Sequence, residues 1–372
     1  MAKSNLSEVL KVFFKLGCIA FGGPAAHVAM MEAEIVSKRK WMTREHFLDL
    51  MGATNLIPGP NSTEMTMHCG YERAGKLGLF VAGAAFIFPA VVITGVLAWF
   101  YVEFGQLPEV AALVFGIKPA VLAIILGAII KLGKKAYKSV QLGVLGVAVL
   151  VACFFGLSEI LALLGAGIIG MFLFYALEKG RPKANSIAPL GLLGMLNLSP
   201  ETLKIFLSFL KVGAILYGSG YVLFAYLDAE LVETGLMTRE ALIDAIAIGQ
   251  FTPGPVLSTA TFIGYQLGGV MGAVAATVGI FLPSFLFVLL LNPIIPRMRK
   301  SLLLSKFLDS VNIAAVAVMA SVLIDMGRTV LVRWEAIVIA VLSLFFTFGP
   351  KKLNSMWIIL GGAILGYLLS ML

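Results

Sequence analysis

Three lysines interrupt otherwise apolar stretches of the sequence, at Lys15, Lys118 and Lys211. If those stretches are membrane helices, an ammonium group at the helix centre costs at least about 2.5 to 3.5 kcal/mol, so a lysine there needs a use or a partner. The use that fits a cation inside a membrane is to bind an anion. Two alternatives stay open, which are an ammonium group that reaches the membrane surface and an ion pair with a carboxylate such as Glu64.

Backbone breaks supply a second set of candidate groups. The tripeptide Pro-Gly-Pro occurs twice, and polar side chains follow each copy. Proline removes an amide donor and restricts the residue before it, while glycine allows a sharp reversal, so a helix has to restart after each tripeptide. A helix start has free amide groups and a positive dipole end, which favour an anion. The predicted groups are the tips Pro58, Gly59, Pro60, Pro253, Gly254 and Pro255, and the residues that follow them, Asn61, Ser62, Thr63, Ser258 and Thr259.

A second kind of break is predicted in the first helix of each half of the chain. These breaks are Gly22-Gly23-Pro24 and Gly218-Ser219-Gly220. The glycines allow the helix to unwind, and the proline lacks an amide donor. We therefore add Gly22, Gly23, Gly218 and Ser219 to the predicted substrate-binding set. The alternatives are that the Pro-Gly-Pro tips are structural turns and that the hydroxyl groups bond to their own helix.

Four titratable residues are candidates for coupling or gating. His27 follows the first break, and an imidazole that titrates near neutral pH could couple proton movement, although a lone histidine is more often a packing residue. Glu64 follows the first Pro-Gly-Pro tip. Glu34 and Glu230 recur at equivalent positions near an expected membrane edge, where a gate, a helix cap and an ion pair with Arg44 or its counterpart are equally consistent with the sequence.

The elements that must position these groups are membrane helices. The chain of 372 residues is 60% hydrophobic and 13% charged, with a mean hydropathy of +0.98. The apolar stretches 77–101, 110–130, 140–157 and 160–177 approach or exceed the roughly 20 residues that a spanning helix needs. An alternating strand pattern is missing, so we predict an all-α multi-pass protein of the inner or plasma membrane, surrounded by the lipid bilayer. We expect no cleaved signal at the N-terminus.

Several other classes are disfavoured by composition and spacing. Cys18, Cys69 and Cys153 show no CxxC spacing, and His68 beside Cys69 has no further ligands at metal spacing, so neither a metal nor a cofactor is expected. The net charge of +8 is typical of membrane proteins with basic cytoplasmic loops, and we predict no nucleic-acid partner.

An internal repeat runs through the chain at a separation of about 195 residues. We divide the chain into an N-terminal transmembrane repeat, residues 1–183, and a C-terminal one, residues 184–372. The matching segments include Phe14-Lys15-Leu16-Gly17 with Leu210-Lys211-Val212-Gly213, Met42-Thr43-Arg44-Glu45 with Met237-Thr238-Arg239-Glu240, and the two Pro-Gly-Pro tips.

The two repeats are predicted to have opposite orientation. The segments on either side of the first tip, 45–57 and 62–71, are each too short to cross a bilayer, so they form a re-entrant hairpin that returns to its starting side. Each half then has about five spans and one hairpin, and an odd number of spans inverts the second half. With the 38–40 loop in the cytoplasm, most of the 28 basic residues lie on the cytoplasmic side, and both termini lie outside.

The sequence contains the motifs Phe21-Gly22-Gly23-Pro24-Ala25-Ala26-His27, the two Pro-Gly-Pro tips and Gly116-Ile117-Lys118-Pro119-Ala120. With these motifs it resembles a known family, the chromate ion transporters in their long, two-domain form, over nearly the whole chain. The resemblance implies two homologous domains and export of chromate from the cytoplasm, which gives chromate resistance, with sulfate as a chemical mimic. The second half departs from the first where the Gly-Gly-Pro motif and the histidine stand.

Our sequence-based hypothesis is a secondary transporter that exports chromate, a tetrahedral dianion, through a site between the two hairpins. A transporter of sulfate or another anion, and an anion channel of the same architecture, remain alternatives, and a homodimer is left open. A membrane enzyme that uses His27, His68 and Glu64 as acid and base is disfavoured, because these residues form no nucleophile and base arrangement. We therefore predict that the protein is not an enzyme.

Overall fold

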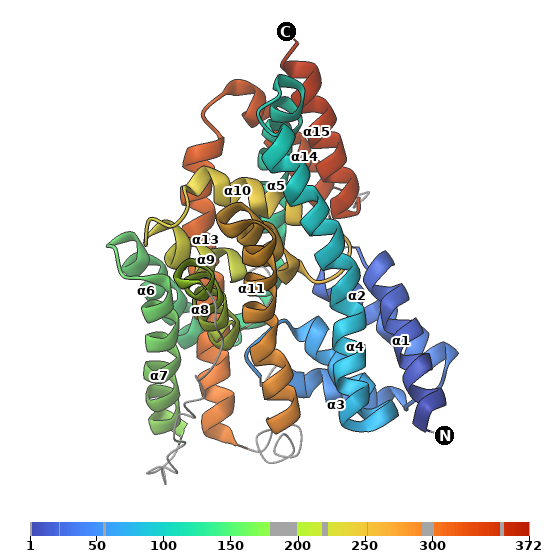
Figure 1. Cartoon of the computed structure of the whole chain (residues 1–372). Helices are drawn as coiled ribbons and strands as arrows, with labels where there is room; N and C mark the ends of the chain where they lie inside the picture. Colours follow the sequence, from blue (N-terminus) through green and yellow to red (C-terminus); the bar gives the residue numbers. More distant parts are fainter. Residues whose placement is uncertain are drawn as a thin grey trace.

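The computed structural model describes residues 2–21, 23–54, 57–178, 199–217, 222–250, 252–291, 301–349 and 353–371, and every regular element in these ranges is a helix (Figure 1). The helices of the N-terminal half are α1 (Ala2–Ile19), α2 (Pro24–Met31), the π-helix η1 (Glu32–Lys38), α3 (Arg44–Thr54), α4 (Asn61–Phe104), α5 (Pro108–Ala136), α6 (Val140–Phe154) and α7 (Glu159–Glu178). Those of the C-terminal half are α8 (Pro200–Ile215), α9 (Leu223–Leu227), the π-helix η3 (Asp228–Val232), α10 (Arg239–Gln250), the short 3-10 helix η4 (Val256–Ser258), α11 (Thr259–Leu291), α13 (Leu302–Val330), α14 (Trp334–Phe348) and α15 (Ser355–Leu369).

Local sequence signals set several of the helix starts. The hydroxyl groups of Ser139, Ser199 and Ser301 accept hydrogen bonds from the amide three residues further on, at the beginnings of α6, α8 and α13. Asn354 caps α15 through its side-chain oxygen. Each cap satisfies an amide that would otherwise lack a partner at a helix start.

Four stretches within the described ranges are long and apolar enough to cross a membrane, namely α4, α5, 256–290 and α13. The predicted spans 77–101 and 110–130 fall within α4 and α5. By contrast, α6, α14 and α15 have 15 residues each, or about 22 Å, which is shorter than the apolar layer of about 30 Å. An all-helical polytopic membrane protein is confirmed, whereas these lengths do not by themselves support five full spans in each half.

The outer faces of the bundle are apolar. Large hydrophobic side chains are exposed along the outer helices, which is unusual in water and is the normal arrangement against lipid tails. Examples are Leu77 and Phe88 on α4, Val144 on α6, Val274 on α11 and Val341 on α14.

The two long helices α4 and α11 are interrupted at equivalent positions. In α4 the break lies at Ala74 and Gly75, where the glycine has a φ of 64°, and in α11 at Gly268 and Gly269, where it has a φ of 57°. Each break separates a short arm, which follows a Pro-Gly-Pro tip, from a long helix. The matching dihedral angles show that the sequence repeat is also a repeat of backbone conformation.

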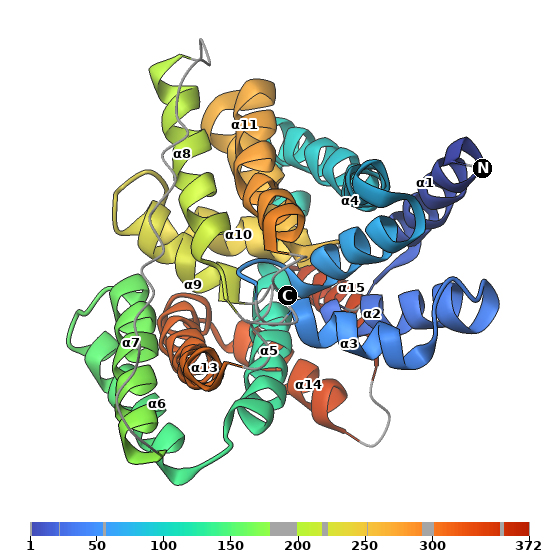
Figure 2. The ribbon, with the colours of Figure 1, turned by 90° about the horizontal axis from the view of Figure 1, so that it is seen from below.

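The final helix pair of each half packs against a long helix of the other half. Helix α5 contacts α14 and α15, and α13 contacts α6 and α7, as the two views show (Figures 1 and 2). Small residues allow both approaches, because Gly116 of α5 meets Gly362 and Gly366 of α15, and Gly170 of α7 meets Ser310 of α13. This exchange ties the two halves into one bundle.

The chain turns back after the first helix, whereas the predicted topology has the broken first helix cross the membrane once. The carboxylate of Glu8 accepts hydrogen bonds from Arg39 at 2.8 Å, from Arg73 at 2.7 Å and from the indole of Trp41 at 3.3 Å. The start of α1 therefore lies beside the end of η1, so the chain turns back at the break after α1. The prediction that both termini lie outside rested on that crossing, and in Figure 1 the start of α1 and the end of α15 lie at opposite ends of the molecule.

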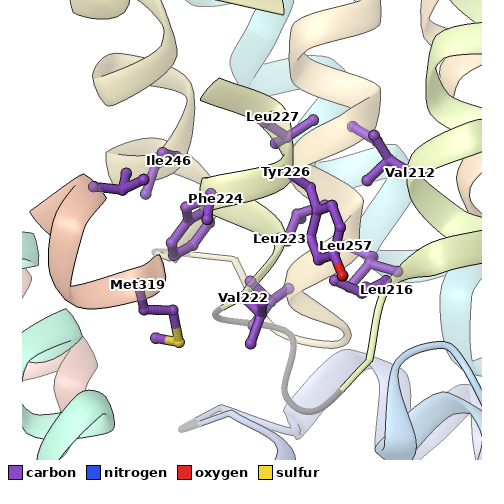
Figure 3. Packing of buried hydrophobic residues seen from close by; sticks show 14 of the residues in the cluster. Val212, Leu216, Val222, Leu223, Phe224, Tyr226, Leu227, Ile246, Leu257 and Met319 are labelled. Carbon is purple, nitrogen blue, oxygen red and sulfur yellow. The ribbon is translucent and has the colours of Figure 1, made fainter. Parts of the chain in front are cut away.

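The core of the C-terminal half surrounds the short helix α9, all five residues of which are buried. Figure 3 shows Leu223, Phe224 and Leu227 packed among side chains of α8, α10 and α13. The phenol of Tyr226 is the polar exception, and its hydroxyl donates to the carbonyl of Ile215 at 2.8 Å, which satisfies one of the last carbonyls of α8.

Candidate functional site

The two Pro-Gly-Pro tips meet the broken first helices of the opposite halves. The amide of Gly59 donates to the carbonyl of Leu216 at 2.6 Å, and the amide of Gly254 donates to the carbonyl of Ala20 at 2.9 Å. Ala20 and Leu216 directly follow the last residues of α1 and α8, so the two contacts are equivalent in the repeat. All six tip residues are buried, and the two contacts form what we call the tip crossing.

Glycine is required at both tips by conformation and by space. Gly59 has a φ of 142° and Gly254 a φ of 88°, a region that other L-residues rarely adopt. A Cβ on Gly254 would lie 2.8 Å from the Cβ of Ala90, and one on Gly59 would lie 2.6 Å from Oγ of Ser284. Ala90 and Ser284 are themselves equivalent in the repeat, so each tip fits a socket on the long helix of α4 or α11.

His27 joins the tip crossing from the N-terminal half only. Its Nε2 lies 3.0 Å from the carbonyl oxygen of Ala20, and its Nδ1 lies 3.3 Å from Oγ of Ser62 at the start of α4. A carbonyl only accepts, so Nε2 carries the hydrogen, and Nδ1 of the neutral ring accepts from the serine. The counterpart of His27 is Leu223, which is buried in the apolar cluster of Figure 3.

A small polar pocket opens beside the second tip. Its volume is about 10 Å³, which is room for about one water molecule and much too little for a tetrahedral oxyanion. The helix starts of α2 and α15 border it, at Gly23 and at Ser355, and Nε2 of Gln250 has no partner within the described chain. The lining residues are Phe21, Gly23, Gly249, Gln250, Thr252, Gly254, Val256, Ser355 and Met356.

The hydroxyl groups after the tips are buried but differ in their partners. Ser62, Thr63, Ser258 and Thr259 are all at most 2% exposed. Thr259 donates to the carbonyl of Val256 in its own helix start at 2.8 Å, which is the structural alternative weighed from the sequence. Oγ of Ser258 accepts from Thr94 of the opposite half at 3.3 Å. Asn61, at the beginning of α4, is not without a partner.

The three lysines do not converge on the tip crossing. Lys15 lies on an exposed face of α1. Lys211 is 55% exposed and forms an ion pair with Glu230 at 2.6 Å. Lys118 forms an ion pair with Asp244 at 2.7 Å, so its partner is a carboxylate of α10 and not Glu64. The side-chain positions described do not bring the three lysines together at the tip crossing, and an anion path lined by them stays a prediction.

Glu34 and Glu230 form ion pairs, but not with Arg44 and Arg239, the partners considered from the sequence. Glu34 pairs with Arg39 at 2.9 Å and with Lys38 at 3.4 Å. The acids two residues before Glu34 and Glu230 are the ones that pair with the repeated arginines, because Glu32 lies 2.9 Å from Arg44 and Asp228 lies 2.7 Å from Arg239. Glu34 and Glu230 thus hold neighbouring basic residues and do not contact the tip crossing.

Some predicted residues cannot be placed, and some relevant ones were missed. Gly22, Gly218 and Ser219 lie outside the described residues. Asp244 was missed, although Asp49 occupies the same position in the first hairpin, and that repeated acid was the available signal. Gln250 was also missed, although Asn55 is an amide at the same position before the first tip, whereas Ser284 aligns with Ala90 and carried no comparable signal. Within the described ranges, no cluster of three His, Cys, Asp or Glu residues could hold a metal ion.

Comparison with known proteins gives a consistent result. A family model described as chromate transporter matches the chain twice, at residues 7–171 and 203–367. A chromate transport protein of Cupriavidus metallidurans is 30% identical over 97% of this chain and 92% of its own length, and one of Pseudomonas aeruginosa is 28% identical over 96% and 90%. An uncharacterized transporter of Methanocaldococcus jannaschii is 27% identical over 99% and 96%. No solved structure matches the chain.

Proposed function

Since the chain belongs to the chromate transporter family, we propose that it carries chromate out of the cytoplasm across the inner membrane as a secondary transporter. Two observations support chromate as the substrate. The family model matches the chain twice, and relatives that align over nearly its full length are named as chromate transport proteins. Those names describe transport and not catalysis, which agrees with a protein that is not an enzyme. The four long apolar helices supply the membrane-spanning framework.

We propose that the anion binds at the tip crossing, between the two re-entrant hairpins of an inverted repeat. The reciprocal hydrogen bonds from Gly59 to Leu216 and from Gly254 to Ala20 support a pseudo-twofold axis there. Helix starts at α2 and α4, together with Ser62 and His27, bring amide, hydroxyl and imidazole groups to one place. These groups suit a dianion, because hydrogen bonds to a charged acceptor are about twice as strong as neutral ones.

Transport through this site requires the halves to move apart. The pocket beside the second tip is far too small for chromate, so the arrangement described is occluded. A rocking motion that breaks one tip contact at a time would open the crossing to one side and then the other. Because each tip makes its contact with the opposite half, the two hydrogen bonds are natural points of release.

The orientation proposed here keeps the basic loops in the cytoplasm and changes the N-terminus. The start of α1 lies with Arg39 and Arg73, so it takes the same side as the 38–40 loop. A membrane potential that is negative on the cytoplasmic side then favours export of the dianion, by about 2.3 kcal/mol per charge per 100 mV. The odd number of spans predicted for each half no longer supports inversion of the second half. The reciprocal tip contacts are now the support for it.

Counterflow in proteoliposomes tests this function. Vesicles loaded with unlabelled chromate should take up labelled chromate, and external sulfate, molybdate and chloride should compete in proportion to their affinity. If the vesicles take up sulfate but not chromate, the proposed substrate would change to sulfate and the proposed mechanism would remain. A steady conductance in place of counterflow would favour an anion channel, and the absence of movement of all four anions would overturn the proposed function.

A further inference from the structure

Glu64 is a buried carboxylate without a partner in the described structure. It lies in the first turn of α4, its side chain is 0% exposed, and neither of its oxygens has a hydrogen-bond partner. No ion pair involving Glu64 occurs within the described residues. An ionised carboxylate in that position would lose its hydration without compensation, which is far more costly than burying the neutral acid. The arrangement described therefore requires a proton on Glu64.

The surroundings of Glu64 come from both halves. A Cβ on Gly59 would contact Oε1 of Glu64 and Oγ of Ser284, so the carboxyl group and the α11 hydroxyl both border the first tip. Oγ of Ser284 is also buried and unpartnered, and so is Oγ1 of Thr63. Movement of the first tip would change every one of these contacts.

The charged groups described for α1 and α10, which pack near α4, are paired or exposed. In α1, Glu8 pairs with Arg39 and Arg73, while Lys11 and Lys15 are exposed. In α10, Asp244 pairs with Lys118, and the described part of α11 contains no charged residue. Four other titratable groups lie on α2, α3 and α4. On α2, His27 contacts Ala20 and Ser62. The others are Glu45 and Asp49 on α3 and His68, one turn further along α4 than Glu64.

Glu64 has no acidic counterpart in the second half. The tips align Glu64 with Thr259, whose hydroxyl is satisfied by the carbonyl of Val256. A structural need at this position would be met by a threonine, as the second half demonstrates. One acid for each chain instead limits the site to one proton in each transport cycle.

We infer that Glu64 is a proton-binding site of the transport cycle and that its proton is taken up together with the oxyanion. The inference rests on the proposed transport of an oxyanion through the tip crossing. Ionised Glu64 would place a negative charge at the positive end of α4, where it would compete with the anion two residues from Ser62. The protonated acid removes that competition, so proton and anion bind together.

Cotransport with one proton is compatible with export. A dianion that carries one proton moves a net charge of minus one, which the membrane potential favours by about 2.3 kcal/mol per 100 mV. An outward-acid gradient of one pH unit opposes the proton by about 1.4 kcal/mol. Export therefore remains favourable at ordinary potentials.

The test uses full-length protein in liposomes of phosphatidylcholine and phosphatidylglycerol, with the potential held at zero by potassium and valinomycin. In the wild-type protein, a difference of one pH unit should accumulate labelled chromate about tenfold on the alkaline side. Glu64→Gln, which stays neutral, should keep chromate exchange but lose this accumulation, while the exposed control Glu109→Gln should keep it.

Three outcomes would overturn the inference: unchanged accumulation in Glu64→Gln, accumulation on the acidic side, or accumulation driven by a sodium gradient alone. If Glu64→Gln fails to fold, Ser284→Ala replaces it, since loss of the facing hydroxyl should shift the pH midpoint of chromate binding, and an unchanged midpoint contradicts the inference. Absence of counterflow at equal pH in the wild type would instead count against the proposed function itself.

Discussion

The ammonium group of Lys118 lies 2.7 Å from the carboxylate of Asp244, and this ion pair joins the two halves of the chain. The lysine belongs to α5 and the aspartate to α10, the first arm of the second hairpin. The hydroxyl of Tyr101 at the end of α4 donates to the same carboxylate at 2.6 Å. Two groups of the N-terminal half thus hold one arm of the opposite hairpin, so the pair restrains the hairpin that carries the second tip.

Removal of one partner of this pair should destabilise the protein. Asp244→Asn leaves the ammonium group of Lys118 without its counter-ion at a site where the lysine is only 23% exposed. Breaking a fully buried pair costs about 3 to 5 kcal/mol, and partial exposure lowers the expected loss below that range. Thermal unfolding in detergent should show a clear drop for Asp244→Asn and a much smaller one for Asp325→Asn, whose exposed partner is Arg328.

A double variant separates the pair from its surroundings. Lys118→Gln combined with Asp244→Asn removes both charges, and the two single losses should not add, with a coupling of about 0.5 to 3 kcal/mol. Additive losses would mean that the two residues act independently, in contradiction to the ion pair.

The space around the second tip predicts the effect of one methyl group. Gly254→Ala places a Cβ 2.8 Å from the Cβ of Ala90 in a backbone conformation with a φ of 88°, so the tip has to move and the hydrogen bond to Ala20 should weaken. Chromate counterflow should fall by at least about tenfold, the equivalent of roughly 1.4 kcal/mol.

Gly235 supplies a matched control for that substitution. It has a φ of 72°, yet a Cβ there would meet no atom within 4 Å. Gly235→Ala therefore has the backbone strain of about 1 to 2 kcal/mol without the collision. Equal losses of counterflow in the two variants would show that strain alone, and not the fit of the tip, is responsible.

The histidine that breaks the symmetry of the halves should be needed for transport and not for folding. His27→Leu copies Leu223, the apolar residue that the second half already buries at the equivalent place. The protein should fold, but Ser62 and the carbonyl of Ala20 lose their link, so the start of α4 is less well held. We expect an increased KM for chromate in His27→Leu, measured by counterflow at several concentrations.

The exposed His46 is the control for this change, since it lies 3.2 Å from Glu72 on the surface. His46→Leu should leave KM unchanged. A loss of protein from the membrane in His27→Leu, with normal KM in what remains, would assign the histidine to stability alone.

The sequence predicts the elements and the repeated breaks well, because proline, glycine and long apolar runs act locally. Both tips are found buried, and the break after α1 is where the glycines predicted it. The return of the chain after that break depends on the contacts of Glu8 with Arg39 and Arg73, which are distant in sequence and leave no periodic signal. The exchange of final helix pairs is likewise a tertiary choice that hydropathy cannot reveal.

The lysines of the candidate site show the same limit of prediction from sequence. An apolar run with a lysine indicates depth in the membrane, but the face of the helix decides whether the ammonium group meets the core, a partner or the outside. Lys15 and Lys211 share a repeat position and lie on exposed faces, while Lys118 points to a carboxylate of the other half. The direction of a side chain is set by helix packing, which one sequence does not contain.

These positions predict that the lysines contribute unequally to transport. Lys15→Gln changes an exposed side chain, and Lys211→Gln removes a pair with Glu230 that is 55% exposed on the lysine side, worth about 0 to 1 kcal/mol. Each should keep chromate counterflow within about fivefold of the wild type. Lys118→Gln leaves Asp244 buried without its cation and loosens the second hairpin, so counterflow should fall by at least about tenfold. A large loss in both Lys15→Gln and Lys211→Gln would return the anion path to the repeated lysines and away from the tip crossing, because only direct contact with the dianion would make two outward-facing cations indispensable.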